Sequence, residues 1–452
     1  MLTRRQFLMM TAGAGALLAV GVPAAADDRT GQARQATAVT EVFGDGIRLT
    51  AVAIEYDQPV QAAALEAQAF QVEGRTTTAV FTSTSTDPAQ RAPAGRFVIV
   101  SLSPGDPGAT LAQQGQGNRG DKAGKPTAGG PGAGGPGAGG AGKVGSRPGN
   151  AGAPYRAATA TVVPPGGKPI VTGAVRNLVV DDFAQREFRD PTSGKTLKYN
   201  LFVPKDYDRS RAYPLVLFMH DAGATGDITR TTLLQGLGAV AWAAPGDQAT
   251  RPCFVLAPQY DEIIADDDSR TSSMLDTTID LVNALAGEYG IDRKRLYATG
   301  QSGGCMMAIA MNSKYPEFFA ASFLVAGQWD PALTKPLARQ KLFILVSQDD
   351  SKAYPGQDAI TRVLEQEGAR VSRAVWDGNW SAAQYRAAFD RIDAQRSPIN
   401  YVTFKAGTVI PPGQSAAGAS GHRNTWRLAY SIEPIREWIF QQYRQESGPA
   451  PS

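Results

Sequence analysis

The chain has 452 residues, enough for two domains, and its 42% hydrophobic and 19% charged residues are typical of a globular protein. Its 45 basic and 42 acidic side chains leave a net charge of only +3. This balance provides no basic surface for nucleic acid or an anionic membrane, so neither is expected as a partner.

The first 26 residues have the pattern of an export signal. Arg4 and Arg5 precede an apolar run over residues 9–22, and alanines at 24–26 offer a cleavage site. The paired arginines resemble a twin-arginine signal, which exports folded proteins, although an ordinary secretory signal has a similar layout. The apolar run is shorter than the roughly 20 residues of a membrane-spanning helix. We therefore predict export to the periplasm or the medium, without a membrane span.

Residues 38–102 show strand patterns separated by turns and no helical period. The predicted strands are rich in Val, Ile, Thr and aromatic residues and lie at 37–43, 47–56, 76–83 and 96–102. Gly44-Asp45-Gly46 separates the first two and predicts a hairpin turn. This stretch predicts a small all-β module.

Residues 105–154 are dominated by Gly, Ala and Pro and have no apolar period. Such a segment cannot bury enough surface to offset the entropy lost on ordering, so we predict disorder. A linker between two domains is one interpretation. We prefer a loop inserted within one β-sandwich over 38–182, because two more strand patterns follow at 157–163 and 176–182.

From residue 183 to 447, strand patterns alternate with helical ones, which is typical of an α/β fold with a mostly parallel sheet. Residues 214–219 are continuously apolar, as in a strand buried on both faces. Other strands are expected at 198–203, 254–257, 295–299, 320–326 and 341–346, and helices at 272–289, 304–315, 357–367 and 426–442.

The strongest motif is Gly300-Gln301-Ser302-Gly303-Gly304, a Gly-x-Ser-x-Gly nucleophile elbow between a predicted strand and a predicted helix. Glycines flank the serine because the turn is tight and other backbone atoms come close. The hydroxyl is raised above the sheet at the start of the helix, where the Gly303 N–H can stabilise an oxyanion. The motif predicts that Ser302 is a nucleophile.

A serine hydroxyl needs a general base that is held by an acidic group. Of the two histidines only His422 follows the serine, in a predicted loop just before the last helix, as the order Ser–acid–His requires. The acid should follow the strand at 341–346, where Asp349 and Asp350 are both candidates. We choose Asp350 because its distance past the strand fits the pattern of the fold.

The other histidine, His220, ends an early central strand, where this fold builds its second oxyanion donor. We expect the Ala222 N–H to be that donor, with Asp221 behind it in a position where glycine is usual. His220 can equally anchor the loop through hydrogen bonds.

The remaining pocket candidates are weaker. Gln301 lies within the elbow, while Trp329 and Tyr260 follow strands at the same edge of the sheet, where each can line the pocket or pack in the core. The acidic run Asp266-Asp267-Asp268 could hold calcium, but we favour a solvated loop.

Cys253 and Cys305 are the only cysteines in the sequence. Both are expected to be buried and unreactive. Two cysteines are too few for a disulfide scaffold, and they supply too few soft ligands for a metal site.

Around the serine, the sequence resembles the polyhydroxybutyrate depolymerase and feruloyl esterase group of the α/β-hydrolase superfamily. The resemblance covers 190–445 and rests on residues 290–304, 314–321 and 426–430. It implies an α/β-hydrolase fold that hydrolyses carboxylic esters with Ser302, His422 and Asp350 and without a cofactor. The β-rich part is similar to an immunoglobulin-like module that precedes some of these esterases.

Two other functions stay open. A prolyl-oligopeptidase-like peptidase would use the same acyl transfer to serine, but no propeller-type repeat precedes the α/β part. A surface-binding protein could also retain the fold without activity. The expected partner is a small-molecule or polymeric ester, and the β module is a candidate for contact with a polymer or a cell surface.

Overall fold

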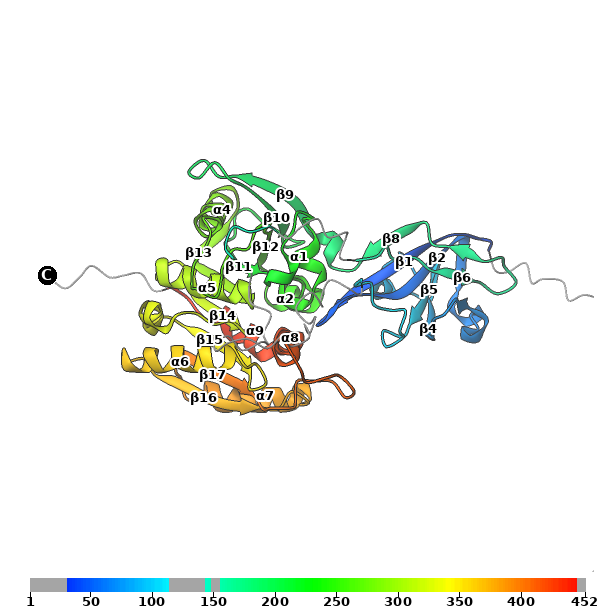
Figure 1. Ribbon diagram of the computed structural model, residues 1–452. Helices are drawn as coiled ribbons and strands as arrows, with labels where there is room; N and C mark the ends of the chain where they lie inside the picture. The colour runs from blue at the N-terminus through cyan, green and yellow to red at the C-terminus, as the bar shows by residue number, and fades with distance from the viewer. Residues whose placement is uncertain (1–30, 114–142, 148–154, 445–452) are drawn as a thin grey trace, which may run out of the picture.

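The computed structural model describes residues 31–113, 143–147 and 155–444 (Figure 1). The predicted export signal and much of the segment at 105–154 lie outside the described residues. The prediction of disorder is wrong for residues 105–113, where Ala109 and Leu111 are buried and form backbone hydrogen bonds with Leu49 and Ile47. Within the described residues, no helix is long and apolar enough to cross a membrane.

The N-terminal β module contains two sheets. Strands β1 (Ala33–Phe43) and β2 (Gly46–Gln61) form an antiparallel hairpin around the predicted turn. The larger sheet has the order β4-β5-β2-β1-β8 and the smaller one β3-β6-β7. The remaining strands are β3 (Gln71–Val72), β4 (Thr77–Ser83), β5 (Ala94–Leu102), β6 (Thr161–Val163), β7 (Ile170–Val171) and β8 (Ala174–Asn177).

Strands from both sides of the Gly-rich segment pair with one another. β8 lies parallel to β1, and β6 lies antiparallel to β3. The pattern predicted as a strand at 176–182 is shorter, because β8 ends at Asn177 and Val180–Asp182 is a 3-10 turn. From these pairings we propose that residues 38–182 form one β-sandwich and that the Gly-, Ala- and Pro-rich segment at 105–154 is inserted within it.

The rest of the chain forms a nine-stranded sheet with the order β16-β17-β15-β14-β13-β11-β12-β10-β9. Only β9 and β10, at one edge, run antiparallel to their neighbours. The strands are β9 (Ala184–Arg189), β10 (Thr196–Phe202), β11 (Tyr213–Met219), β12 (Phe254–Gln259), β13 (Ile291–Gln301), β14 (Ala321–Val325), β15 (Leu342–Ser347), β16 (Val371–Trp376) and β17 (Ile399–Phe404).

Helices cover both faces of this sheet. Successive side chains of its buried strands point to opposite faces, and those on both faces are apolar. Leu215 and Leu217 of β11 belong to a buried cluster that includes side chains of α4, α5 and α6, whereas Val216 and Phe218 belong to a second cluster that includes side chains of α2, α7 and α9. Figure 1 shows helices on both sides of the sheet. The helices are α1 (Thr231–Leu234), α2 (Leu237–Ala243), α3 (Pro245–Thr250), α4 (Met274–Glu288), α5 (Gly303–Lys314), α6 (Ala353–Gln366), α7 (Ala382–Asp393), α8 (Ser420–Ala429) and α9 (Glu433–Phe440).

The single helix predicted over 426–442 is wrong, since the chain forms two helices there, α8 and α9. Pro434 stands in the first turn of α9, where its missing N–H costs no hydrogen bond, and it starts a new helix. Strands β16 and β17 and helix α7 were not predicted.

The β module and the α/β domain share one apolar core. Val42 and Ile47 of the module belong to the same buried cluster as Leu233, Leu234 and Trp242 of the α/β domain. Figure 1 shows β1 reaching from the module toward α2 and α8. The two parts are therefore packed together, not merely joined by the chain.

Candidate active site

Ser302 lies in a tight turn between β13 and α5. Its φ of 52° and ψ of −118° are rare for a residue other than glycine. Glycines make room for the turn: a Cβ on Gly304 would lie 2.0 Å from the Met219 carbonyl oxygen, and one on Gly300 would lie 2.5 Å from Gly304. This is the local geometry of a nucleophile elbow, and it presents the serine at the start of α5.

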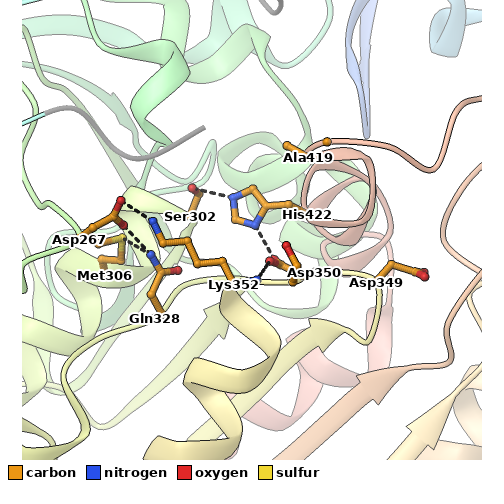
Figure 2. Close-up of a pocket in the computed structure, with 11 residues that line it drawn as sticks. Asp267, Ser302, Met306, Gln328, Asp349, Asp350, Lys352, Ala419 and His422 are labelled. Atoms are coloured by element: carbon orange, nitrogen blue, oxygen red, sulfur yellow. Dashed lines mark hydrogen bonds and ion pairs between the residues drawn. The ribbon is translucent and has the colours of Figure 1, made fainter. Parts of the chain in front are cut away.

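Hydrogen bonds join Ser302, His422 and Asp350 in one line (Figure 2). His422 Nε2 lies 2.8 Å from Ser302 Oγ, and His422 Nδ1 lies 2.5 Å from Asp350 Oδ2. If the ring proton is on Nδ1, this N–H donates a hydrogen bond to the Asp350 carboxylate. Nε2 is then an acceptor and receives a hydrogen bond from the Ser302 hydroxyl. The three side chains come from the turn after β13, the loop after β15 and the start of α8.

The Asp350 carboxylate is only 3% exposed. Burial opposes its ionisation, but hydrogen bonds from His422 and from the N–H groups of Ala353 and Lys352 outweigh burial and hold its pKa below the ordinary value. Both N–H groups reach Oδ1, at 2.8 Å from Ala353 and 3.2 Å from Lys352. The other oxygen, Oδ2, is left to face the imidazole.

Asp349, the alternative acid, points away from His422 (Figure 2). Its Oδ2 accepts hydrogen bonds from the Gly407 N–H at 2.8 Å and from the Ser347 hydroxyl at 3.3 Å. It therefore ties the loop after β15 to the loop after β17. Of the two candidates, Asp350 is the one that contacts the imidazole.

His422 lies in the first turn of α8 and not in a loop, which corrects the prediction. The helix begins at Ser420, where Gly421 lets it approach the loop after β15: a Cβ on Gly421 would lie 2.4 Å from Asp349 Cβ. One turn further on, Trp426 packs edge-on to the imidazole, with 4.7 Å between the ring centres. Helix packing thus fixes the position and tilt of the ring.

The backbone nitrogen of Ala222 lies beside Gly303, the residue after Ser302. An ideal Cβ on Gly303 would lie 3.4 Å from the Ala222 nitrogen, so these two residues are in contact. Neither N–H has a hydrogen-bond acceptor among the residues that the structure describes. Free N–H groups beside a nucleophile can bind a developing oxyanion.

The loop that carries Ala222 is held by three polar side chains. His220 is 1% exposed; its Nδ1 lies 2.7 Å from the Asp221 carbonyl oxygen, and its Nε2 accepts the Tyr260 N–H at 3.0 Å. Burial lowers the pKa of His220, which favours this neutral, loop-anchoring state. Asp221 accepts hydrogen bonds from the Gly223 N–H and from Gln301 Nε2, so the loop is tied directly to the elbow.

Tyr260 and Trp329 pack in the core beside α4 and α5, which corrects their assignment to the pocket. Tyr260 is fully buried, and its hydroxyl lies 3.0 Å from the Thr278 hydroxyl. Trp329 is 6% exposed, and neither ring lines the cavity beside Ser302. Both rings therefore pack in the core and do not line the pocket.

A cavity of about 30 Å³ opens beside Ser302 and His422 (Figure 2). Part of its wall is polar: Lys352 forms an ion pair with Asp267, and Gln328 Nε2 donates to Asp267 Oδ1 at 2.8 Å. These three side chains were not predicted to line the pocket. They come from three loops that are far apart in the sequence and meet only in the folded chain. The sequence offers one hint of their place, which is that Lys352 closely follows Asp350.

The acidic run at 266–268 is not uniformly solvated, which corrects that prediction. Asp266 is 3% exposed and accepts hydrogen bonds from Arg270 and from the Val144 N–H. Among the described residues, no group of three or more His, Cys, Asp or Glu side chains is arranged to hold a metal ion.

Both cysteines are buried and free, as predicted. Burial raises the pKa of Cys253 and of Cys305 to about 12, so neither thiol forms a ready nucleophile.

Comparison with known proteins relates both parts of the chain to esterases. Residues 35–153 match the family described as the esterase Ig-like N-terminal domain. The chain is 45% identical to acetylxylan esterase A of Aspergillus ficuum over 47 residues, 10% of this chain and 16% of that enzyme. It therefore matches only a small part of the length of that curated relative.

A solved thermostable esterase is similar in structure over almost the whole chain, with a TM-score of 0.70 and 23% sequence identity. The similarity covers 91% of this chain and 100% of that one. The predicted fold is confirmed: the chain has an α/β-hydrolase fold preceded by an esterase-type immunoglobulin-like domain.

Proposed function

We propose that this chain is an exported serine hydrolase that cleaves carboxylic esters through an acyl-enzyme intermediate. The observation that carries the proposal is the line of hydrogen bonds from Ser302 through His422 to the buried Asp350 carboxylate, at 2.8 and 2.5 Å. Its similarity to proteins named as esterases favours ester substrates. Export rests on the arginine pair and apolar run in residues 1–26.

In the first half-reaction, Ser302 Oγ attacks the ester carbonyl carbon while His422 Nε2 takes the hydroxyl proton. The negative charge that develops on the carbonyl oxygen is stabilised by the N–H groups of Gly303 and Ala222. Asp350 holds the ring in the required tautomer and stabilises the imidazolium. The C–O bond to the alcohol then breaks, and His422 returns its proton to the departing alkoxide.

In the second half-reaction, water replaces the alcohol. His422 takes a proton from water, whose oxygen attacks the acyl carbon, and the bond to Ser302 Oγ breaks as the proton returns to the serine. The acid product leaves and the resting state is restored. His220, Asp221 and Gln301 act at a distance in this scheme, because they hold the loop that carries the Ala222 N–H.

The cavity favours a short acyl group. A volume of about 30 Å³ accommodates two or three water-sized atoms, if each needs about 10–15 Å³. We therefore propose acetyl and propionyl esters as better substrates than esters of longer acids.

The proposal is tested with a fluorophosphonate probe, which reacts with an activated serine. We expect labelling of the intact protein and none of Ser302→Ala, together with hydrolysis of p-nitrophenyl acetate. No labelling of folded protein would instead favour a binding protein, and faster cleavage of peptide anilides than of esters would favour a peptidase.

A further inference from the structure

The tip of the β1–β2 hairpin touches the helix that carries His422. An ideal Cβ on Gly44 would lie 2.0 Å from the carbonyl oxygen of Arg427, in the last turn of α8. On the other side, a Cβ on Gly236, just before α2, would lie 3.0 Å from the Gly44 carbonyl oxygen. The hairpin tip, residues 43–46, is thus lodged between α8 and the start of α2 (Figure 1).

Contacts of Arg48 brace the hairpin tip. Arg48 forms an ion pair with Asp45 at 2.6 Å, donates to the Pro104 carbonyl oxygen at 2.7 Å and lies over the Phe43 ring at 5.2 Å. A contact with this tip therefore transmits the position of the β module to α8.

Helix α8 is held at both ends. Its first turn, with His422, approaches the loop of Asp349 and Asp350 through Gly421, and its last turn meets Gly44. A helix of ten residues behaves as a short rod, so a displacement of one end tilts the other. The 2.8 Å hydrogen bond between His422 and Ser302 depends on that tilt.

We infer that the hairpin tip of the β module is a positioning element for the general base, with Gly44 as its positioning residue. The inference rests on the proposed function, because it assigns to the module a role in that same site. The module thereby completes the alignment of α8, in addition to packing on the α/β domain.

The requirement for glycine at position 44 is one of space. Gly44 is not among the residues with positive φ, so alanine is compatible with its backbone. The added methyl group would stand 2.0 Å from the Arg427 oxygen, whereas real Cβ atoms essentially never approach another atom closer than 3.0 Å. The two backbones would therefore have to move about 1 Å further apart. A displacement of about 1 Å at a catalytic group can cost on the order of 100-fold in rate.

The test compares three variants of the full-length chain: Gly44→Ala, Gly236→Ala and Gly173→Ala. Gly173 is the matched control, because it lies in the β module and a Cβ there would meet nothing within 4 Å. Fluorophosphonate titration to completion counts the competent serines, and kcat on p-nitrophenyl acetate is expressed per titrated site. Thermal unfolding monitors the fold of each variant.

For Gly44→Ala we expect full titration, slower labelling, a kcat lowered about 10- to 100-fold and a KM within about 3-fold of the wild type. Gly236→Ala, with its longer 3.0 Å approach, should lose about 3-fold in kcat, and Gly173→Ala should match the wild type.

Unchanged kcat per titrated site in Gly44→Ala would overturn the inference, even if fewer serines titrated, because a purely structural contact changes the amount of folded protein and not its turnover. If Gly44→Ala yields no folded protein, Gly236→Ala decides by the same criterion. A wild-type chain that neither labels nor hydrolyses esters refutes the proposed function itself, which is a separate outcome.

Discussion

Replacing Asp350 with asparagine should reverse the tautomer of His422. The backbone N–H groups of Ala353 and Lys352 both point at Oδ1, so the asparagine carbonyl oxygen must take that position. Its NH2 group then occupies the place of Oδ2, 2.5 Å from His422 Nδ1, and can only donate. Nδ1 becomes an acceptor, the ring proton moves to Nε2, and Nε2 can no longer take the proton of Ser302.

The loss should be large, because one wrong tautomer disables both proton transfers. The equivalent substitution in other serine hydrolases lowers kcat by about 10⁴, or about 5 kcal/mol of transition-state stabilisation. We expect kcat for p-nitrophenyl acetate to fall by 10³- to 10⁴-fold, on the order of that precedent. The Tm should also fall somewhat, because the low pKa of Asp350 in the folded state stabilises the fold.

Asp349→Asn is the matched control for this substitution. Its carboxylate accepts hydrogen bonds from Gly407 and Ser347 and does not touch the imidazole. Asparagine also keeps the Cβ and backbone that contact Gly421 of α8, so kcat should stay within about 3-fold of the wild type. A large loss in Asp349→Asn with Asp350→Asn nearly unaffected would refute the assignment of the acid.

Three further predictions concern pH and the cavity. The rate should fall in acid, because a protonated His422 cannot accept the serine proton, and a rate that no acidic pH lowers would contradict this. Asp190 is buried. Hydrogen bonds from Ser193, Thr192 and Thr277 nevertheless lower its pKa to about 2. Since unfolded Asp titrates near pH 3.9, the stabilisation is complete above about pH 4 and is lost as the pH falls toward 2. Asp190→Asn should therefore lower the Tm at pH 7 and do so progressively less below pH 4. Lys352→Ala should enlarge the cavity and raise kcat/KM for butyrate relative to acetate by about 10-fold, and an unchanged ratio would exclude Lys352 from acyl selection.

The parts of the fold that could be predicted are those whose signals are local. Continuous apolar runs such as β11 mark strands buried on both faces, and the elbow packs strand end, turn and helix start into a few residues. A Gly-Asp-Gly sequence between two β-rich runs likewise marked the β1–β2 hairpin. In each case neighbours along the chain are also neighbours in space.

The parts that could not be predicted depend on packing between distant segments. β17 is fully buried but carries Asn400 and Thr403, so its apolar pattern is interrupted although tertiary contacts place it in the sheet. Trp329 and Tyr260 follow strands at the correct edge, yet a sequence does not tell which side of the strand end a ring packs on. The Lys352–Asp267 ion pair joins loops far apart in the chain and has no motif at all.

The positions of Ser302, Asp350 and His422 are fixed in different ways. Ser302 is set by its own neighbours, because glycines at 300 and 304 allow the backbone a conformation that would be strained elsewhere. Asp350 is set by the two N–H groups that follow it. His422 has no such local device: α8 takes its position from Asp349 at one end and from a hairpin near the start of the chain at the other. Substitutions that shift α8 should therefore impair activity from a distance more readily than substitutions near the elbow, whose geometry is fixed within five residues.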